Sequence, residues 1–140
     1  MDESLLRSLA EFRFQMRKFL SFSEMASERS GIPAQQYQLI QVIAAIPEGQ
    51  QASITYLAER MILRHNSTVE LVDRAERAGL VYRESDPSDL RRSLVHLTAD
   101  GQRILEGLVH EHMNELIPRC ETLINALRNL QGSATSDKSS

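Results

Sequence analysis

The chain has 140 residues and a single cysteine, Cys120, which excludes an intrachain disulfide and a metal site built from cysteines. A hydrophobic share of 41% and a charged share of 25% are typical of a globular domain, and the net charge of −3 excludes a strongly basic nucleic-acid-binding protein. The acidic start and the absence of a long apolar run predict neither a secretory signal nor a membrane helix, so we expect a cytoplasmic protein with no membrane partner.

Residues 5–29 are predicted to form one long helix. Apolar and small side chains recur at alternating intervals of four and three, the spacing of helices that pack along their length: Leu5, Leu9, Phe12, Met16, Phe19, Ser23 and Ala26. More apolar residues lie off this seam, among them Phe14 and Leu20. The helix therefore either carries a wide core face within one subunit or is buried between subunits.

Three short helices follow in the next part of the chain. Pro33 favours a helix start at residue 34, and the pattern continues to residue 46. Ser53 is a suitable N-cap for a helix over 54–61. The third helix runs from about residue 65 to residue 78, where Gly79 is suited to a left-handed helix end.

The period of the apolar pattern then changes from that of a helix to that of strands. Residues 80–84 and 93–97 are predicted strands, and residues 85–89, rich in turn-forming types, are predicted to connect them. The result is a hairpin with Arg91 and Arg92 near its tip.

A final helical region begins at Thr98, which we expect to cap it. Pro118 must interrupt this region because it lacks a backbone N–H, and the pattern resumes through residue 130. Cys120 is interpreted as a buried filler there. Residues 132–140 are small and polar, and we expect a disordered tail.

This order of elements predicts a mainly α fold with a small β-hairpin, a winged helix-turn-helix. The helix over 65–78 would present polar side chains on its outer face, including Asn66 and Arg74, which can each form two hydrogen bonds with a base edge. Its anionic member, Glu70, would repel phosphate unless it pairs with Arg74 or accepts from cytosine.

Several motifs, in this order and spacing, resemble the multiple-antibiotic-resistance regulator (MarR) family of bacterial transcription factors. They cover residues 53–60, 63–67, 71–74, 79–81, 86–92 and 95–101, and the likeness extends over about residues 34–103. The last two read Asp-Pro-Ser-Asp-Leu-Arg-Arg and Val-His-Leu-Thr-Ala-Asp-Gly.

The resemblance implies one winged-helix domain over 1–131, with a DNA-binding lobe over 34–103 and dimerisation helices over 5–29 and 104–130. It also implies a homodimer on a pseudo-palindromic operator in double-stranded DNA. The residues implied to contact DNA are Arg64, His65, Asn66, Ser67 and Arg74 at the major groove, and Arg91 and Arg92 at the wing. Asp89 is implied to orient the wing arginines, and Asp73 to do the same from the helix.

The family likeness further implies a repressor that a small aromatic ligand releases from DNA. Phe12, Met16, Phe19 and Tyr37 are candidates to line the ligand pocket, or they are ordinary core residues. The alternative function is a dimeric winged-helix module that binds protein instead of DNA, which the acidic net charge leaves open.

An enzyme is not predicted. His110 and His112 are two positions apart, which places them on opposite sides of a helix, so they cannot share a metal ion as the two histidines of His-Glu-x-x-His do. We see no phosphate-binding glycine loop and no nucleophile elbow, and expect neither a metal nor another cofactor.

Overall fold

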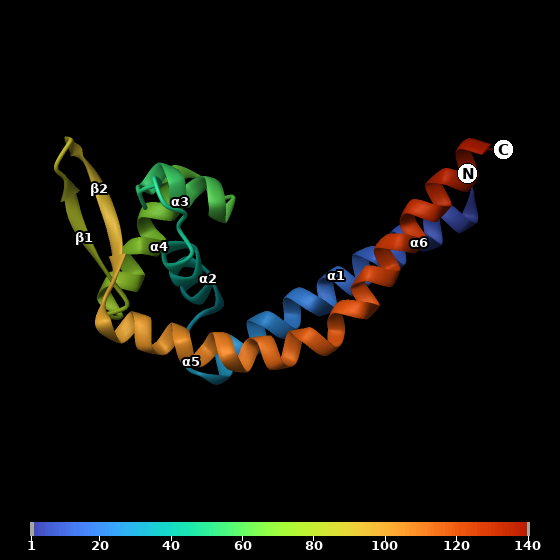
Figure 1. Ribbon diagram of the computed structural model, residues 1–140, viewed down its shortest axis with the longest axis horizontal. Coiled ribbons are helices and arrows are strands. Elements are labelled where there is room, and N and C mark those ends of the chain that lie inside the picture. Colours follow the sequence, from blue (N-terminus) through green and yellow to red (C-terminus); the bar gives the residue numbers. More distant parts are fainter. Residues whose placement is uncertain (1, 140) are drawn as a thin grey trace. The chain divides into compact units, whose positions relative to one another are not determined.

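The computed structural model describes residues 2–139, with side chains through Ser133. The chain forms two compact units, here called the lobe, Ser27–Val109, and the helical unit, Met1–Ala26 with His110–Ser140. The elements in chain order are α1 Glu3–Arg29, α2 Ala34–Ala44, α3 Ile54–Met61, α4 His65–Arg77, β1 Val81–Asp86, β2 Asp89–Leu97, α5 Ala99–Leu116, η1 Ile117–Arg119 and α6 Cys120–Ser139 (Figure 1). The predicted fold class, mainly helical with one hairpin, is confirmed.

Local signals set the boundaries of the short helices in the lobe. The Ser53 hydroxyl accepts a hydrogen bond from the backbone N–H of Tyr56 at 3.2 Å and caps α3 as predicted. Between α3 and α4, Ile62 adopts a left-handed conformation with φ of 55° and is 90% exposed. Gly79, with φ of 77°, ends α4 in the predicted left-handed conformation.

The core of the lobe is made by the inner faces of α2, α3 and α4 with the start of the hairpin and the first part of α5. Figure 1 shows α4 between the hairpin and α2. The largest fully buried apolar side chains in this core are Tyr37, Leu39, Ile40, Leu57, Leu71, Val72, Val81 and Val95. This burial fixes which face of α4 remains in solvent.

The hairpin is longer than the sequence predicts, and its turn is tighter. Strand β1 continues to Asp86 and β2 already begins at Asp89, whereas the sequence analysis places the whole of 85–89 in a turn. The register passes from Ser85↔Ser93 to Asp86↔Asp89, so residues 90–92 bulge from β2. The prediction failed because alternation does not reveal a bulge, which breaks the period of two.

Two further contacts fix the hairpin. Tyr82 and His96 face each other across the strands with ring centroids 5.3 Å apart. On the side of α3, the Val95 N–H donates to the Ala52 carbonyl at 2.9 Å, and Ser53 forms a β-bridge with Leu94. The segment that caps α3 is therefore joined directly to β2.

In the helical unit, α6 runs antiparallel beside α1 (Figure 1), and the hydroxyls of Ser8 and Ser133 are 2.6 Å apart. Pro118 interrupts the helix as predicted, through a short 3-10 turn. Cys120 is exposed, so its interpretation as buried filler is wrong for the single chain. The sequence could not reveal this, because the exposure of Cys120 depends on which residues pack against its helix in the fold.

The end of the chain also differs from the expectation. The backbone of α6 is helical to Ser139, whereas the sequence analysis expects disorder from residue 132. No proline follows Pro118 to end the helix. None of the helices described by the structure is long and apolar enough to cross a membrane.

Candidate nucleic-acid interface

The outer face of α4 is mostly polar and exposed to solvent. Thr68, Leu71, Val72 and Ala75 point into the core, at the spacing of one helix face. The predicted contact residues therefore lie on the opposite face, and Arg64, His65, Asn66, Ser67 and Arg74 are all exposed. Arg64 also supports the helix start, because its carbonyl accepts a hydrogen bond from the Thr68 hydroxyl at 2.9 Å.

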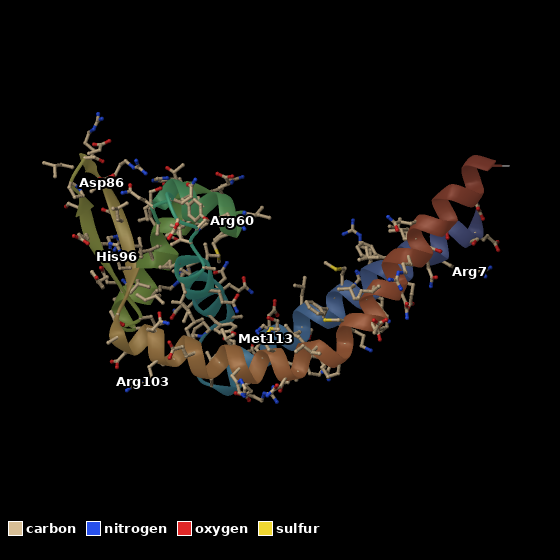
Figure 2. The ribbon with its side chains drawn as sticks, viewed as in Figure 1. Arg7, Arg60, Asp86, His96, Arg103 and Met113 are labelled. Carbon is tan, nitrogen blue, oxygen red and sulfur yellow. The ribbon has the colours of Figure 1, made fainter. Side chains whose placement is uncertain are left out.

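The bulge in β2 presents both predicted wing arginines to solvent. Figure 2 shows Asp86 close to the tip of the hairpin, on the strand that faces this bulge. The Arg91 side chain is 91% exposed and that of Arg92 is 46% exposed. Their different exposure shows that the two guanidinium groups have different surroundings.

Each wing arginine lies beside its own carboxylate. Asp89 Oδ1 accepts hydrogen bonds from the backbone N–H of Arg91 at 3.1 Å and from its Nε at 3.2 Å. The predicted contact of Asp89 with a wing arginine is thus present. Asp86, which the sequence analysis did not select, lies with Oδ2 3.8 Å from Nη1 of Arg92.

Asp86 is the buried acidic residue of the wing, with 1% of its surface exposed. Its Oδ1 accepts from the backbone N–H of Ser88 at 2.9 Å and from the Ser88 hydroxyl at 2.7 Å. These hydrogen bonds, the hydroxyl's first, lower the pKa of Asp86 below its ordinary value, with a smaller contribution from the Arg92 charge; burial opposes them. The group therefore remains a carboxylate at neutral pH.

A third arginine connects the wing to α4. Arg83 of β1 donates from Nη2 to Asp73 Oδ1 at 2.6 Å and from Nη1 to Glu76 Oε1 at 3.0 Å. The family resemblance implies that Asp73 orients the wing arginines, but it points to neither Arg83 nor Glu76. The spacing of Asp73 and Glu76 by three residues, which puts both on one helix face, was the signal that could have found them.

Two hollows on the surface of the lobe are lined by side chains of this region. One, of about 170 Å³, is lined by His65, Arg91 and Arg92 together with Ser53, Ile54, Thr55 and Ser93. The other, of about 740 Å³, is open and polar and is lined by Gly49, Gln50, Gln51, Ser53, Thr55, Tyr56, Glu59 and Arg92. Thr55 and Arg92 line both hollows, so the start of α3 is part of this surface, which the sequence analysis missed.

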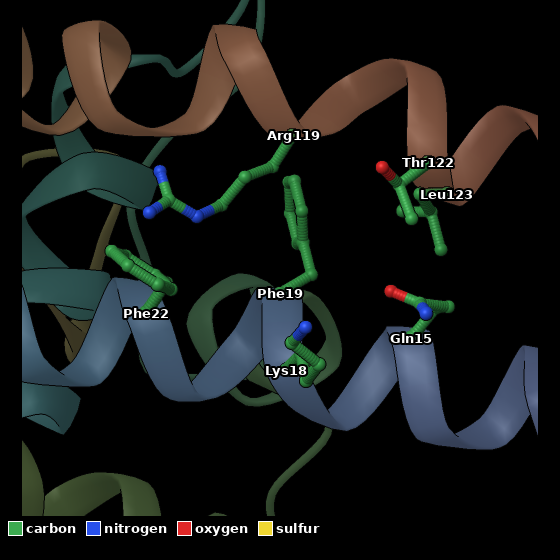
Figure 3. Close-up of a pocket in the computed structure, with 7 residues that line it drawn as sticks. All are labelled: Gln15, Lys18, Phe19, Phe22, Arg119, Thr122 and Leu123. Carbon is green, nitrogen blue, oxygen red and sulfur yellow. The ribbon is translucent and has the colours of Figure 1, made fainter.

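The four candidate ligand-pocket residues lie in different surroundings. Tyr37 is a core residue of the lobe, 1% exposed, and burial raises its pKa against a hydrogen bond with Gln41 that lowers it. Phe19 lines a hollow of about 70 Å³ in the helical unit (Figure 3). Phe12 and Met16, on the same helix, are half-buried.

The hollow at Phe19 is partly closed by its own residues. Arg119 lies with its guanidinium carbon 3.3 Å from the centre of the Phe22 ring, and it donates to the Glu115 carbonyl (Figure 3). Pockets that enclose a drug-sized molecule have volumes of about 300 Å³ or more. At about 70 Å³, this hollow is too small for an aromatic ligand of that size.

The two histidines of the His110-Glu111-His112 segment differ in burial, because His110 is exposed and His112 is buried. Among the described residues, no three histidine, cysteine or acidic side chains gather in a way that could hold a metal ion.

The arrangement of a capped short helix, a second short helix with an exposed polar face, and a hairpin with arginines at its tip defines a winged helix-turn-helix protein. Residues 30–92 match the sequence model described as MarR family. The lobe is therefore similar in sequence to the MarR family.

Individual relatives are similar to the chain as well. The transcriptional regulator HosA of Escherichia coli O111:H- is 38% identical over 74 residues, which is 53% of this chain and 53% of HosA. The chain spans between about half and three fifths of the length of the first curated relatives it matches.

Solved structures share the fold over nearly the whole chain. AbsC, a MarR family transcriptional regulator from Streptomyces coelicolor, superposes with a TM-score of 0.78 at 18% identity, covering 100% of this chain and 98% of AbsC. The MepR–DNA complex of S. aureus gives a TM-score of 0.65 at 21% identity, covering 97% of this chain and 98% of MepR. At these identities the likeness shows the fold.

Proposed function

We propose that this protein is a sequence-specific DNA-binding transcriptional regulator that acts as a homodimer. The observation that carries the proposal is the gathering, on one surface of the lobe, of the exposed face of α4 and two wing arginines, each beside a carboxylate. MepR, whose fold is similar, is solved as a complex with DNA.

In the proposed complex, α4 enters the major groove. Asn66 and Arg74 have the donors and acceptors to read base edges, whereas Arg64 and Ser67 suit phosphate oxygens. Their exposure, with the opposite helix face held in the core, leaves them free to approach DNA. We assign His65 to the same surface because it lines a hollow with both wing arginines.

The wing supplies the second set of contacts. Arg91 extends from the bulge with 91% of its side chain exposed, and a guanidinium of this kind is attracted into a narrow A·T-rich minor groove. Asp89 orients it through the contacts at 3.1 and 3.2 Å. The wing would therefore favour DNA by shape, while α4 reads the sequence.

The helical unit is proposed to join two copies of the chain. Eight of its large apolar side chains are exposed in the single chain, each between 43% and 59%: Leu6, Leu9, Phe14, Leu20, Met25, Met113, Ile117 and Leu127. A second copy would cover them, and a two-fold dimer of winged-helix lobes reads half-sites about 34 Å apart. This geometry predicts a pseudo-palindromic operator.

A dimer also reconciles the acidic net charge with DNA binding. The acidic residues outnumber the basic ones over the whole chain, but residues 60–92 hold seven arginines against six acidic side chains. Two lobes on one DNA duplex double the cationic side chains at the interface, and local charge decides phosphate binding more than net charge does.

Repression released by a small aromatic ligand belongs to the same proposal and is supported by the family resemblance. Phe12, Met16, Phe19 and Tyr37 remain its candidate residues, although Tyr37 lies in the core of the lobe and the hollow at Phe19 measures about 70 Å³. Such a ligand would lower the affinity of the dimer for DNA, and titration of small aromatic acids against the bound complex would detect it.

The experiment that tests the proposal is selection of duplexes from a random pool by the purified chain, followed by sequencing. We expect a pseudo-palindromic motif, bound with an affinity that falls steeply as salt rises. Asn66→Ala should blur the selected motif, costing about 1–3 kcal/mol of base discrimination. Arg91→Ala should weaken binding to all duplexes.

Arg103→Ala is the matched control, because it removes an exposed guanidinium of the same lobe away from this surface, on α5 (Figure 2). We expect it to bind DNA as the unmodified chain does. A pool without an enriched motif, with no salt-dependent binding, would instead favour the protein-interaction module.

A further inference from the structure

The wing contains a buried carboxylate whose role the proposed function does not explain. Asp86 is 1% exposed, although acidic side chains are rarely buried without a compensating partner. Oδ1 is fully engaged by Ser88, through its N–H and its hydroxyl. Within the described part of the chain, Oδ2 accepts no hydrogen bond, and its ion-pair partner is Arg92 at 3.8 Å.

The turn itself needs only half of this carboxylate. The two hydrogen bonds to Ser88 close the turn through one oxygen, and an asparagine side chain could accept both in the same way. What an amide could not provide is a negative charge at Oδ2. The structure therefore separates a turn-forming oxygen from an oxygen that faces the guanidinium of Arg92.

Arg92 is placed differently from Arg91. Its side chain is 46% exposed, against 91% for Arg91, and it lines the two hollows that border the start of α3. The bridge between Ser53 and Leu94 joins that start to β2, so its distance from the wing is fixed by backbone contacts.

The surroundings of Arg92 suit an anion. Thr55 is exposed in the first turn of α3, where its hydroxyl can donate, and the positive end of the helix dipole lies there. An arginine carries five N–H donors, so one that is held on one side by a carboxylate still has donors for a phosphate on the other. The lining of the larger hollow adds the amides of Gln50 and Gln51, and it also includes one acidic side chain, Glu59.

We propose that Asp86 is a positioning residue that holds Arg92 at the front of α3, where Arg92 and Thr55 together bind one backbone phosphate of DNA. This inference rests on the proposed function and assigns the two wing arginines separate tasks. Arg91 extends from the tip toward the minor groove, whereas Arg92 binds the backbone beside α3. Because Asp86 is 1% exposed, its carboxylate is not presented at the surface that would meet the DNA.

The test uses the full chain and a fluorescein-labelled duplex recovered by the selection described above. Affinity is measured by anisotropy over a series of NaCl concentrations for Asp86→Asn, Arg92→Ala and the double variant. Asp86→Asn keeps an oxygen for Ser88 and removes the charge. We expect each single variant to lose about tenfold in affinity and about one unit of the salt slope.

The double variant decides whether the two residues act as one. If Asp86 works through Arg92, the double variant binds no more weakly than Arg92→Ala alone. The matched control is the pair Asp100→Asn and Arg103→Ala, another aspartate–arginine contact of the lobe, at 2.9 Å. Its variants should leave both affinity and salt slope unchanged.

A second measurement keeps the inference testable if Asp86→Asn unfolds the hairpin. Replacing single phosphates of the duplex by neutral methylphosphonates should reveal one position in each half-site that weakens binding of the unmodified chain. In Arg92→Ala, neutralising that phosphate should no longer weaken binding. Thr55→Val should weaken binding to the natural duplex but not to the duplex with a methylphosphonate at that position.

The outcomes separate this inference from the proposed function. Three results would each overturn the inference while leaving DNA binding intact. The first is a folded Asp86→Asn with normal affinity and salt slope, and the second is a double variant in which the two losses multiply. The third is the lack of any methylphosphonate position whose effect depends on Arg92. Failure of the unmodified chain to select any duplex would overturn both.

Discussion

Gly101 lies where the first turn of α5 passes the end of α4. A Cβ atom added at this position would be 2.1 Å from the carbonyl oxygen of Leu80, a backbone atom that cannot rotate away. The Leu80 carbonyl is held there by the Thr98 N–H, which donates to it at 3.0 Å. Glycine is therefore required at Gly101 by close packing of two backbones.

We predict that Gly101→Ala destabilises the lobe by about 2 kcal/mol, because α5 must move away from Leu80. Urea unfolding followed by circular dichroism would measure this loss. Gly107→Ala, on the same helix with no atom within 4 Å of the added Cβ, is the control and should raise stability by up to about 1 kcal/mol. Equal effects of the two variants would contradict the packing argument.

His112 in α5 is a second residue with a measurable consequence. Burial lowers its pKa below the ordinary value of 6.5, and the nearby charge of Glu115 opposes this in part. The folded chain thus holds the imidazole neutral where the unfolded chain would protonate it. As the pH falls from about 6.5 toward the lower folded-state pKa, the unfolded chain binds more protons.

We therefore predict that the free energy of unfolding is lower at pH 5.5 than at pH 7.5, and that His112→Gln reduces this difference. Urea titrations at both pH values and one fixed protein concentration would show it. The neighbouring variant His110→Gln, at an exposed position, serves as the control. An unchanged pH dependence in His112→Gln would show that His112 is not its source.

At the scale of elements, the lobe depends on how the wing is attached to α4 and to α3. Backbone hydrogen bonds join β2 to the segment before α3, and the ion pairs of Arg83 join β1 to α4. The exposed fractions are 25% for the Arg83 side chain, 43% for Asp73 and 42% for Glu76. Partial burial of this kind makes the pairs stronger than isolated surface pairs.

We predict that Arg83→Met lowers stability by about 1 kcal/mol and weakens DNA binding, because the wing loses its side-chain connection to α4. Thermal unfolding and anisotropy with the selected duplex would measure the two effects. The control is Arg77→Met, which changes an exposed arginine of α4. The prediction fails if Arg83→Met and Arg77→Met behave alike.

At the scale of the whole molecule, the proposed dimer depends on the exposed apolar side chains of the helical unit. In the described residues, its fully buried apolar side chains are small ones such as Ala26 and Ala126, while its large ones are half-buried or exposed. Helices of this composition are stabilised by burial against another surface. A second copy would supply that surface.

We predict a particle of twice the chain mass of 15.9 kDa in sedimentation equilibrium. Leu20→Glu, which places a charge on the exposed apolar face of α1, should shift the protein toward the single chain and weaken DNA binding. Ile62→Glu makes the same change at a 90% exposed position of the lobe and should leave the mass unchanged. A single-chain mass for the unmodified protein would contradict the dimer.

Helix ends that depend on local rules could be predicted from the sequence. Ser53, Gly79, Thr98 and Pro118 each act on the backbone within a few residues, so their effects on helix ends could be predicted. The exposed face of α4 was also predicted correctly, since helical period and apolar content identify the buried face. Asp89 was found through the family likeness.

Residues that act across the chain were missed for a physical reason. The alternation of polar and apolar residues along the strands does not reveal the bulge at 90–92. In the folded hairpin, Arg92 lies beside the start of α3 and Asp86 is buried. Arg83 meets Asp73 only after β1 has folded back onto α4. The apolar pattern of α1 was equally compatible with a core within one subunit and with an interface between subunits.

The sequence by itself determined the order of elements, their caps and the winged-helix class, because these depend on neighbours along the chain. The tertiary structure alone decided which carboxylate meets which arginine and which apolar faces remain uncovered. Those pairings depend on distances between residues that are remote in sequence, and only packing of the elements fixes such distances.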